Sequence, residues 1–117
     1  MKIKAANFIL YCKEMESTVA WYKQILKLDV SFSNEWFVEF SLNEKAKLSI
    51  ANEAKASIKS SRGKGITISL NVDDITDKHL SLIEAGLNPS SIKTIWHSKA
   101  FYIYDPEGNR IEFWSKI

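Results

Sequence analysis

One acidic residue, Glu112, lies in a segment where a carboxylate needs a chemical reason. The segment "RIEFWSK" (110–116) sets Glu112 among aromatic and branched residues, which is typical of a β-strand. A carboxylate in such a strand is rarely buried unless a metal, a ligand or an internal hydrogen-bond donor such as Tyr102 pairs with it. The sequence leaves these three roles for Glu112 open.

Two histidines and one cysteine are further candidates for binding a metal or acting as a nucleophile. His79 lies beside the apolar positions of a helical segment, which favours a structural role, whereas His97 follows Trp96 in a turn and could reach a ligand site. Cys12 has no histidine or basic cluster beside it, so we expect a buried strand residue. A single cysteine forms no internal disulfide, which is compatible with a reducing cytoplasm.

Length and composition are typical of one soluble globular domain. The 117 residues are 45% hydrophobic and 26% charged, and no apolar run approaches the roughly 20 residues needed to span a bilayer. The net charge is +2, and the densest basic stretch, "KASIKSSRGKG" (55–65), is rich in Ser, Gly and Ala, as solvated linkers are. We therefore expect a cytoplasmic protein with no nucleic-acid or membrane partner.

The same order of secondary structure is predicted twice along the chain. Each half begins with an alternating strand, continues with a helix of 3.6-residue apolar spacing, and ends with three short strands. A shift of about 60 residues places Cys12 over Val72 and Met15 over Ile75, as in an internal duplication. The predicted strands are 7–12, 29–33, 35–42, 46–52, 65–72, 90–96, 100–105 and 110–116, and the predicted helices are 17–28 and 73–87.

The two predicted helices carry local signals at their ends and on their faces. Ser17 is expected to cap the first helix, and Gly86 to end the second. The buried stripe of the second helix is expected to consist of Leu80, Ile83 and Leu87.

These elements predict an α+β fold made of two βαβββ modules. The modules span about 1–52 and 65–117, are joined by a linker at 53–64, and form a single domain over 1–117. Paired modules can form a curved mixed sheet with a helix on the outside of each half and a cleft inside. Small ligands bind in such clefts because side chains from several strands converge there.

The sequence resembles the vicinal oxygen chelate superfamily, which includes glyoxalase I, extradiol dioxygenases, and the bleomycin and fosfomycin resistance proteins. The resemblance rests on "STVAWYKQIL" (17–26) and, more specifically, on "FYIYDPEGNRIEFW" (101–114), with its Asp-Pro-acid-Gly-Asn turn and last strand. In the turn, Pro106 fixes one φ angle, Gly108 or Asn109 can adopt a positive φ, and Asp105 can bond to the backbone ahead of it. We interpret this turn as structural.

Enzymes of this superfamily bind a divalent metal with residues of the first and last strands of each module. The resemblance places Asn7, Ser49, Thr67 and Glu112 at those positions. Only Glu112 is a good ligand for zinc, iron or manganese, because Asn, Ser and Thr offer weak neutral oxygens. We therefore expect no bound metal and no cofactor, unless His97 completes an altered site.

The predicted ligand pocket has aromatic walls around a few polar groups. If Glu112 faces the cleft, alternation places Arg110 and Trp114 on the same side, and Ile111 and Phe113 on the side of the helix. The resemblance also directs Tyr102 inward, and Trp96 is expected near the mouth. The complete predicted set is Asn7, Ser49, Thr67, Trp96, Tyr102, Glu112 and Trp114.

Such a lining suits a planar or partly apolar ligand that carries a hydrogen-bond donor or a positive charge. The first hypothesis is a metal-free protein that binds and sequesters a small molecule, as the bleomycin resistance proteins do. The alternatives are an enzyme of the glyoxalase or dioxygenase type with an altered metal site, in which Glu112 could act as a general base, and a regulatory binding module. By the same resemblance we expect a homodimer, with modules paired within or swapped between chains. The sequence does not name the ligand.

Overall fold

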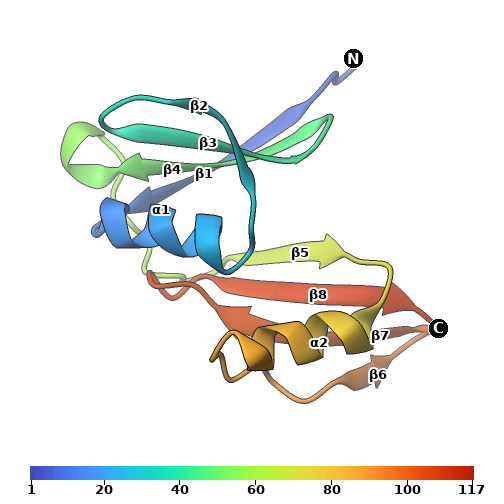
Figure 1. Ribbon diagram of the computed structural model, residues 1–117. Helices are drawn as coiled ribbons and strands as arrows, with labels where there is room; N and C mark the ends of the chain where they lie inside the picture. Colours follow the sequence, from blue (N-terminus) through green and yellow to red (C-terminus); the bar gives the residue numbers. More distant parts are fainter. The chain divides into compact units, whose positions relative to one another are not determined.

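The computed structural model describes all residues, 1–117, and contains two compact units, Met1–Arg62 and Gly63–Ile117. Each unit follows the order βαβββ and forms its own four-stranded mixed sheet, with one helix against one face (Figure 1). The α+β class and the two-module pattern predicted from the sequence are confirmed. Neither helix has the length and apolar character needed to cross a membrane.

The first unit has the strand order β1-β4-β3-β2, in which only β1 and β4 run parallel. Its core lies between α1 and the sheet, where Tyr22 of the helix packs against Phe40, with ring centroids 6.0 Å apart. Cys12 is fully buried at the end of β1, as expected. The elements are β1 (Ala6–Cys12), α1 (Met15–Gln24), β2 (Asp29–Ser33), β3 (Phe37–Asn43), β4 (Ala46–Asn52) and the 3₁₀ turn η1 (Glu53–Lys55).

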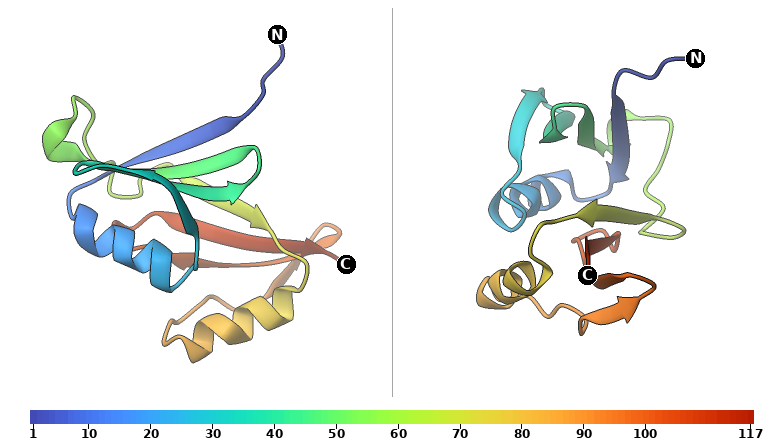
Figure 2. Two further views of the ribbon diagram at one scale, coloured as in Figure 1. Left: turned by 45° about the horizontal axis from the view of Figure 1, so that its top comes forward. Right: turned by 90° about the vertical axis from the view of Figure 1, so that its right-hand side faces the viewer.

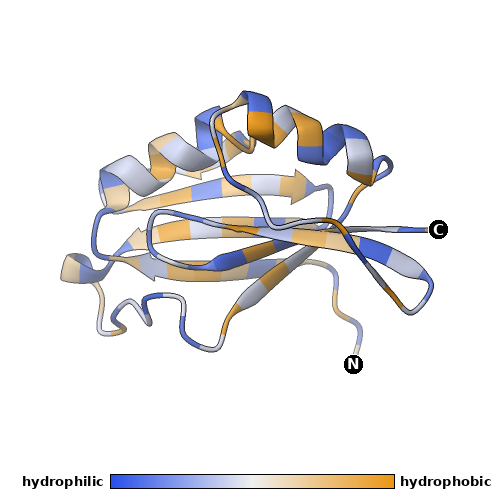
Figure 3. Ribbon diagram, turned by 90° about the horizontal axis from the view of Figure 1, so that it is seen from below, coloured by the Kyte–Doolittle hydropathy of each residue, from blue (hydrophilic) through white to orange (hydrophobic).

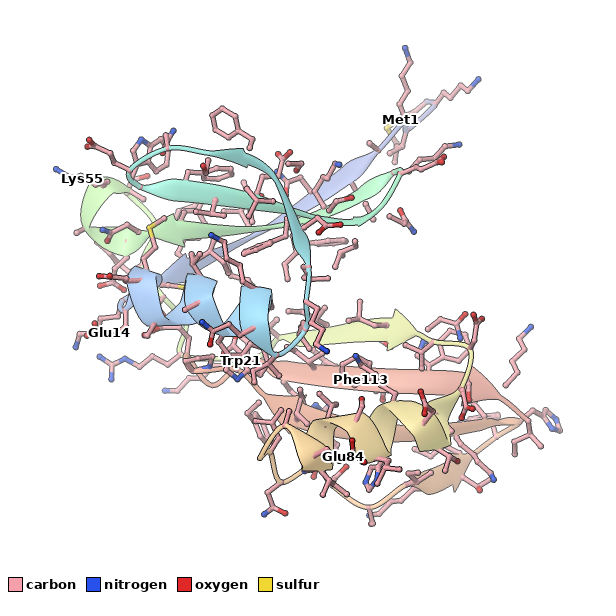
Figure 4. All side chains as sticks on the ribbon, in the orientation of Figure 1. Met1, Glu14, Trp21, Lys55, Glu84 and Phe113 are labelled. Atoms are coloured by element: carbon pink, nitrogen blue, oxygen red, sulfur yellow. The ribbon has the colours of Figure 1, made fainter.

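The second unit has the equivalent strand order β5-β8-β7-β6, again with one parallel pair, β5 and β8. Ile111 and Phe113 of β8 are buried on the side of α2, and Figure 4 marks Phe113 on β8 beside this helix. Phe101 of β7 stacks on Phe113, with centroids 5.3 Å apart. The elements are β5 (Thr67–Asn71), α2 (Ile75–Glu84), β6 (Lys93–Ile95), β7 (Ser98–Tyr104) and β8 (Arg110–Lys116).

In both units, successive side chains along each strand point alternately to the side of the sheet that the helix covers and to the side that it does not cover, which we call the helix-free face. Figure 3 shows this as the alternation of hydrophobic and hydrophilic residues along the strands, and Figure 2 shows from two further directions that each helix lies along one side of its sheet. Each strand therefore places every second side chain on a sheet face that the helix does not cover.

Two local predictions about the helices are wrong. Ser17 does not cap α1, because the helix already begins at Met15 after Glu14, and the Ser17 hydroxyl donates back to the Glu14 carbonyl at 3.3 Å. In α2, Ile75 and Leu82 are the buried residues, whereas Leu80 is 52% exposed and Ile83 48% exposed.

The reason for the second error is geometric. At about 100° per residue, positions 75 and 82 point in nearly the same direction, while 80, 83 and 87 are rotated well away from it. The N-terminus of α2 is capped by Asp74, whose side chain accepts a hydrogen bond from the Asp77 amide at 3.0 Å. Gly86 ends the helix with φ of 90°, as predicted.

The turn before β8 fixes the register of the last strand. The Asp105 carboxylate accepts three bonds of 2.9 Å, from the amides of Glu107 and Asn109 and from the Asn109 side chain. Gly108 has φ of 87°, and a Cβ on Gly63 would lie 2.0 Å from the Gly108 carbonyl oxygen. The structural role predicted for this turn is confirmed, and Gly63 must remain a glycine for the chain to pass beside it.

The basic segment that follows η1 is folded back on itself. The Asn52 side chain accepts from the Ala54 amide at 2.9 Å, and the Glu53 carboxylate accepts from the Ser60 amide at 3.1 Å. The Lys59 ammonium donates to the carbonyls of Glu53 and Ala56. The role of 53–64 as the linker between two modules of one domain stays a prediction.

Candidate functional site

The helix-free face of the second unit carries most of the predicted site. Strand register places Ser69 of β5 and Tyr102 of β7 on either side of Glu112 in β8. The helix-facing neighbours of Glu112, Ile111 and Phe113, are 0% and 2% exposed, so Glu112 itself points away from α2. The residues of this face include Thr67, Ser69, Asn71, Tyr102, Tyr104, Arg110, Glu112 and Trp114, with Lys116 at the far end of β8.

Glu112 is half-buried and has a short internal hydrogen bond. Its Oε1 accepts from the Ser69 hydroxyl at 2.6 Å. The internal partner is therefore Ser69, whereas the sequence had suggested Tyr102. No cation pairs with Glu112 in its unit, and its second oxygen has no hydrogen-bond donor there. A carboxylate that is held by one neutral hydroxyl keeps an open acceptor for a ligand.

Arg110 is held in place on the same face by two contacts. Its Nε donates to the Thr67 hydroxyl at 3.0 Å, and its guanidinium carbon lies 5.3 Å from the centre of the Tyr102 ring. Tyr104 in turn meets Tyr102 edge to face, with centroids 5.7 Å apart. The result is a row of aromatic rings and one oriented guanidinium, with Tyr102 and Tyr104 37% and 56% exposed.

In the first unit, Asn7 and Ser49 lie side by side and form a hydrogen bond with each other. The fully buried Ser49 hydroxyl donates to Asn7 Oδ1 at 2.7 Å. The Asn7 amide donates to Glu39 at 3.3 Å, and the Ser31 hydroxyl donates to the other Glu39 oxygen at 2.9 Å. This network links all four strands of the sheet around one carboxylate.

Sequence reasoning missed Glu39, Ser31 and Ser69. A signal for Glu39 was present: it is the one charged residue in the otherwise apolar and neutral strand "FVEFSL" (37–42), which is the same pattern that singles out Glu112. Ser31 and Ser69 carry no such signal. They matter only because strand pairing places them beside the carboxylates, and the sequence does not give that register.

The remaining candidates lie away from this face. Trp96 is 92% exposed at the tip of the β6–β7 hairpin, with φ of 58°, and His97 beside it is also exposed. His79 forms a 2.9 Å bond to the Ser90 carbonyl and meets the Phe101 ring edge to face at 4.8 Å. The structural role predicted for His79 is confirmed, whereas a pocket role for Trp96 stays a prediction.

The donors at the four metal positions do not fit a tightly bound catalytic metal. Asn7 Oδ1 already accepts from the fully buried Ser49 hydroxyl, and the Thr67 oxygen accepts from the cationic Arg110. Glu112 is the one carboxylate among the four, and no group of three His, Cys, Asp or Glu side chains is arranged to hold a metal ion. Zinc, iron and manganese sites need at least three good protein ligands.

Comparison with known proteins identifies one family and several solved structures of similar fold. Residues 4–113 match the model of the Glyoxalase/Bleomycin resistance protein/Dioxygenase superfamily. A search of curated protein sequences found no match. Among solved structures, lactoylglutathione lyase from Agrobacterium tumefaciens has a TM-score of 0.82 at 15% identity, over 98% of this chain and 95% of that one.

Two further solved structures have the same fold. TnmS3, an antibiotic-binding protein from Streptomyces sp. CB03234, has a TM-score of 0.82 at 15% identity, over 100% of this chain and 97% of that one. TioX from Micromonospora sp. ML1 has a TM-score of 0.76 at 12% identity, over 97% and 98%. At these identities the likeness establishes the fold and not the ligand.

Proposed function

The chain belongs to the glyoxalase/bleomycin resistance protein/dioxygenase superfamily, and from this premise we propose that it binds a small aromatic or partly apolar molecule, without a metal and without chemistry. The observation that supports this function best is the helix-free face of the second unit. There, exposed aromatic rings stand beside one carboxylate whose only partner in the unit is a neutral hydroxyl. Rings supply stacking surface, and the carboxylate supplies orientation.

The donor chemistry at the metal positions also supports binding over catalysis. A metal-dependent lyase or dioxygenase of this fold needs ligands that Asn7, Ser49 and Thr67 do not supply. The likeness to the antibiotic-binding protein TnmS3 agrees with a sequestering role, although at 15% identity it contributes only the fold.

An enzyme is the second candidate, and the fold of lactoylglutathione lyase is the observation that favours it. In that case either His97 would have to complete a metal site with Glu112, or Glu112 would act as a metal-free general base. A base must lie within hydrogen-bond reach of the proton that it removes. The Glu112 oxygen with no donor in its unit leaves room for that role.

Metal content separates these candidates most directly. We would purify untagged protein without chelator, expose it to excess nickel, zinc, manganese and iron(II), and measure bound metal by mass spectrometry. We expect less than about one tenth of a metal ion per chain, because a single carboxylate holds such ions weakly. About one tight ion per chain that is lost in Glu112→Ala would contradict the binding proposal and direct attention to lyase and dioxygenase assays.

A thermal-shift screen of aromatic drugs and metabolites would then test binding itself. A specific ligand should raise the melting temperature of the protein progressively as its concentration exceeds the dissociation constant, and the shift should disappear in Tyr102→Ala. His97→Ala serves as the control outside the helix-free face, and it should respond to the ligand as the unsubstituted protein does. An equal response of both variants would place the ligand elsewhere.

The assembly and location also belong to the proposal. We propose a cytoplasmic homodimer whose partner is a small molecule, with modules paired within or swapped between chains. Light scattering coupled to size-exclusion chromatography would give twice the 13.4 kDa chain mass for this dimer. A regulatory module would instead bind a protein through this face, and a screen without small-molecule hits would favour it.

A further inference from the structure

Arg110 adds a second charge to the face on which Glu112 lies, and this charge has no acidic partner. Resting on the proposed function, we infer that the ligand is a planar aromatic acid whose carboxylate pairs with Arg110, and that Arg110 is the residue that determines this specificity. The inference names the chemical class of the ligand. It would fail, while the proposed function survived, if the protein bound only neutral or cationic aromatic compounds.

The guanidinium is oriented before any ligand arrives. The bond from Nε to the Thr67 hydroxyl uses the side edge of the guanidinium. The guanidinium carbon lies over the Tyr102 ring, 5.3 Å from its centre. Its two terminal nitrogens have no hydrogen-bond partner within the unit. Terminal guanidinium nitrogens present a fork that matches the two oxygens of a carboxylate, and a fork that is already oriented loses little entropy on binding.

The nearest acid along the strand, Glu112, does not neutralise this fork. Glu112 follows Arg110 by two positions on the same face, so their Cα atoms are separated by about 6.6 Å along the strand. Glu112 is held instead by Ser69 on the neighbouring strand. The face therefore presents a positive fork and a negative acceptor as two separate groups, rather than as an internal ion pair.

A ligand that satisfies both groups needs an acid at one end and a hydrogen-bond donor at the other. Tyr102 connects the two positions, because it pairs with Glu112 across the strands and its ring lies under the Arg110 guanidinium. A benzene ring with a carboxylate and a donor in the para positions spans a length similar to the separation of about 6.6 Å between Arg110 and Glu112 along the strand. 4-Aminobenzoate is the simplest probe of this class.

The test compares 4-aminobenzoate with benzamide and aniline, using ligand-observed NMR titration of the full chain. We expect 4-aminobenzoate to bind most tightly, and Arg110→Gln to weaken its binding by about tenfold or more, because hydrogen bonds to charged groups are among the stronger ones. Arg110→Lys should restore only part of the affinity, since an ammonium lacks the fork. Lys116→Gln removes one exposed positive charge from the same strand and should leave binding unchanged.

Three outcomes would overturn the inference. The first is equal weakening by Arg110→Gln and Lys116→Gln, which would indicate a general effect of charge. The second is full recovery in Arg110→Lys, which would exclude a role for the fork. The third is a preference for benzamide or aniline over 4-aminobenzoate. That last result would leave a functional aromatic site with a different ligand class.

Discussion

The two units share one fold but use the helix-free faces of their sheets differently. Each face has one carboxylate held by neutral donors: Glu39 in the first unit and Glu112 in the second. In the first unit the carboxylate lies in the third strand, at the place that Tyr102 occupies in the second. The two units therefore share a backbone topology, but the side chains on their helix-free faces differ.

The difference lies in what surrounds each acid. Glu39 is bonded through both oxygens, and its partner Asn7 is bonded in turn to the fully buried Ser49. Glu112 has one bonded oxygen and lies among exposed tyrosines and an oriented Arg110. A satisfied polar network stabilises a sheet, whereas open donors and acceptors beside rings bind ligands. This difference agrees with a structural role for the first face and with the binding role that we propose for the second.

The turns before the last strands of the two units should differ most in their contribution to stability. Asp105, which is 5% exposed, accepts three hydrogen bonds, while Asn43 in the exposed equivalent turn accepts two from backbone amides. We expect Asp105→Ala to lower the free energy of unfolding by about 3 kcal/mol and Asn43→Ala by about 1 kcal/mol. Urea denaturation followed by circular dichroism measures both, and equal losses would contradict the argument.

The two carboxylates should differ in their effect on ligand affinity. Once the screen has supplied a ligand, Glu112→Gln should weaken its binding by about tenfold, or 1.4 kcal/mol, because the charge that receives the ligand's donor is lost. Glu39→Gln is the matched control in the other unit and should leave the dissociation constant unchanged. Isothermal titration calorimetry gives both values. A larger effect of Glu39→Gln would exchange the roles of the two faces.

Most of the fold could be predicted from the sequence, because each element carries its own local signal. The strands 46–52 and 110–116 match their predicted bounds. Each follows a turn with a clear sequence signal, which contains Asn43 before the first strand and Gly108 before the second. The buried stripe of α2 was predicted wrongly because its apolar residues do not form a single row. Leu80 and Ile83 are as hydrophobic as Ile75 and Leu82, and only packing on the sheet selects between the two sets.

For the candidate site, the sequence predicted which side of the sheet each side chain of β8 faces, but it did not predict the hydrogen-bond partners. Alternation along β8 correctly placed Arg110, Glu112 and Trp114 on one side and their neighbours on the other. Partner choice depends on register between strands more than 40 residues apart in sequence, as the bond from Ser69 to Glu112 shows. No local pattern encodes that register, so the partner of Glu112 had to come from the structure.

The hydroxyl groups beside the two acids offer the smallest and sharpest test of the comparison. Ser49 is fully buried and Ser69 is exposed, although both donate to a side chain on the neighbouring strand. We expect Ser49→Ala to lower the free energy of unfolding by about 1 kcal/mol, because Asn7 loses a bond that water cannot easily replace. Ser69→Ala should change it by less than about 0.5 kcal/mol, since water can bond to the released Glu112 oxygen. Affinity should follow the opposite order, because Ser69 orients the acid that meets the ligand, and a Ser69→Ala variant with normal affinity would show that Glu112 needs no orientation to bind.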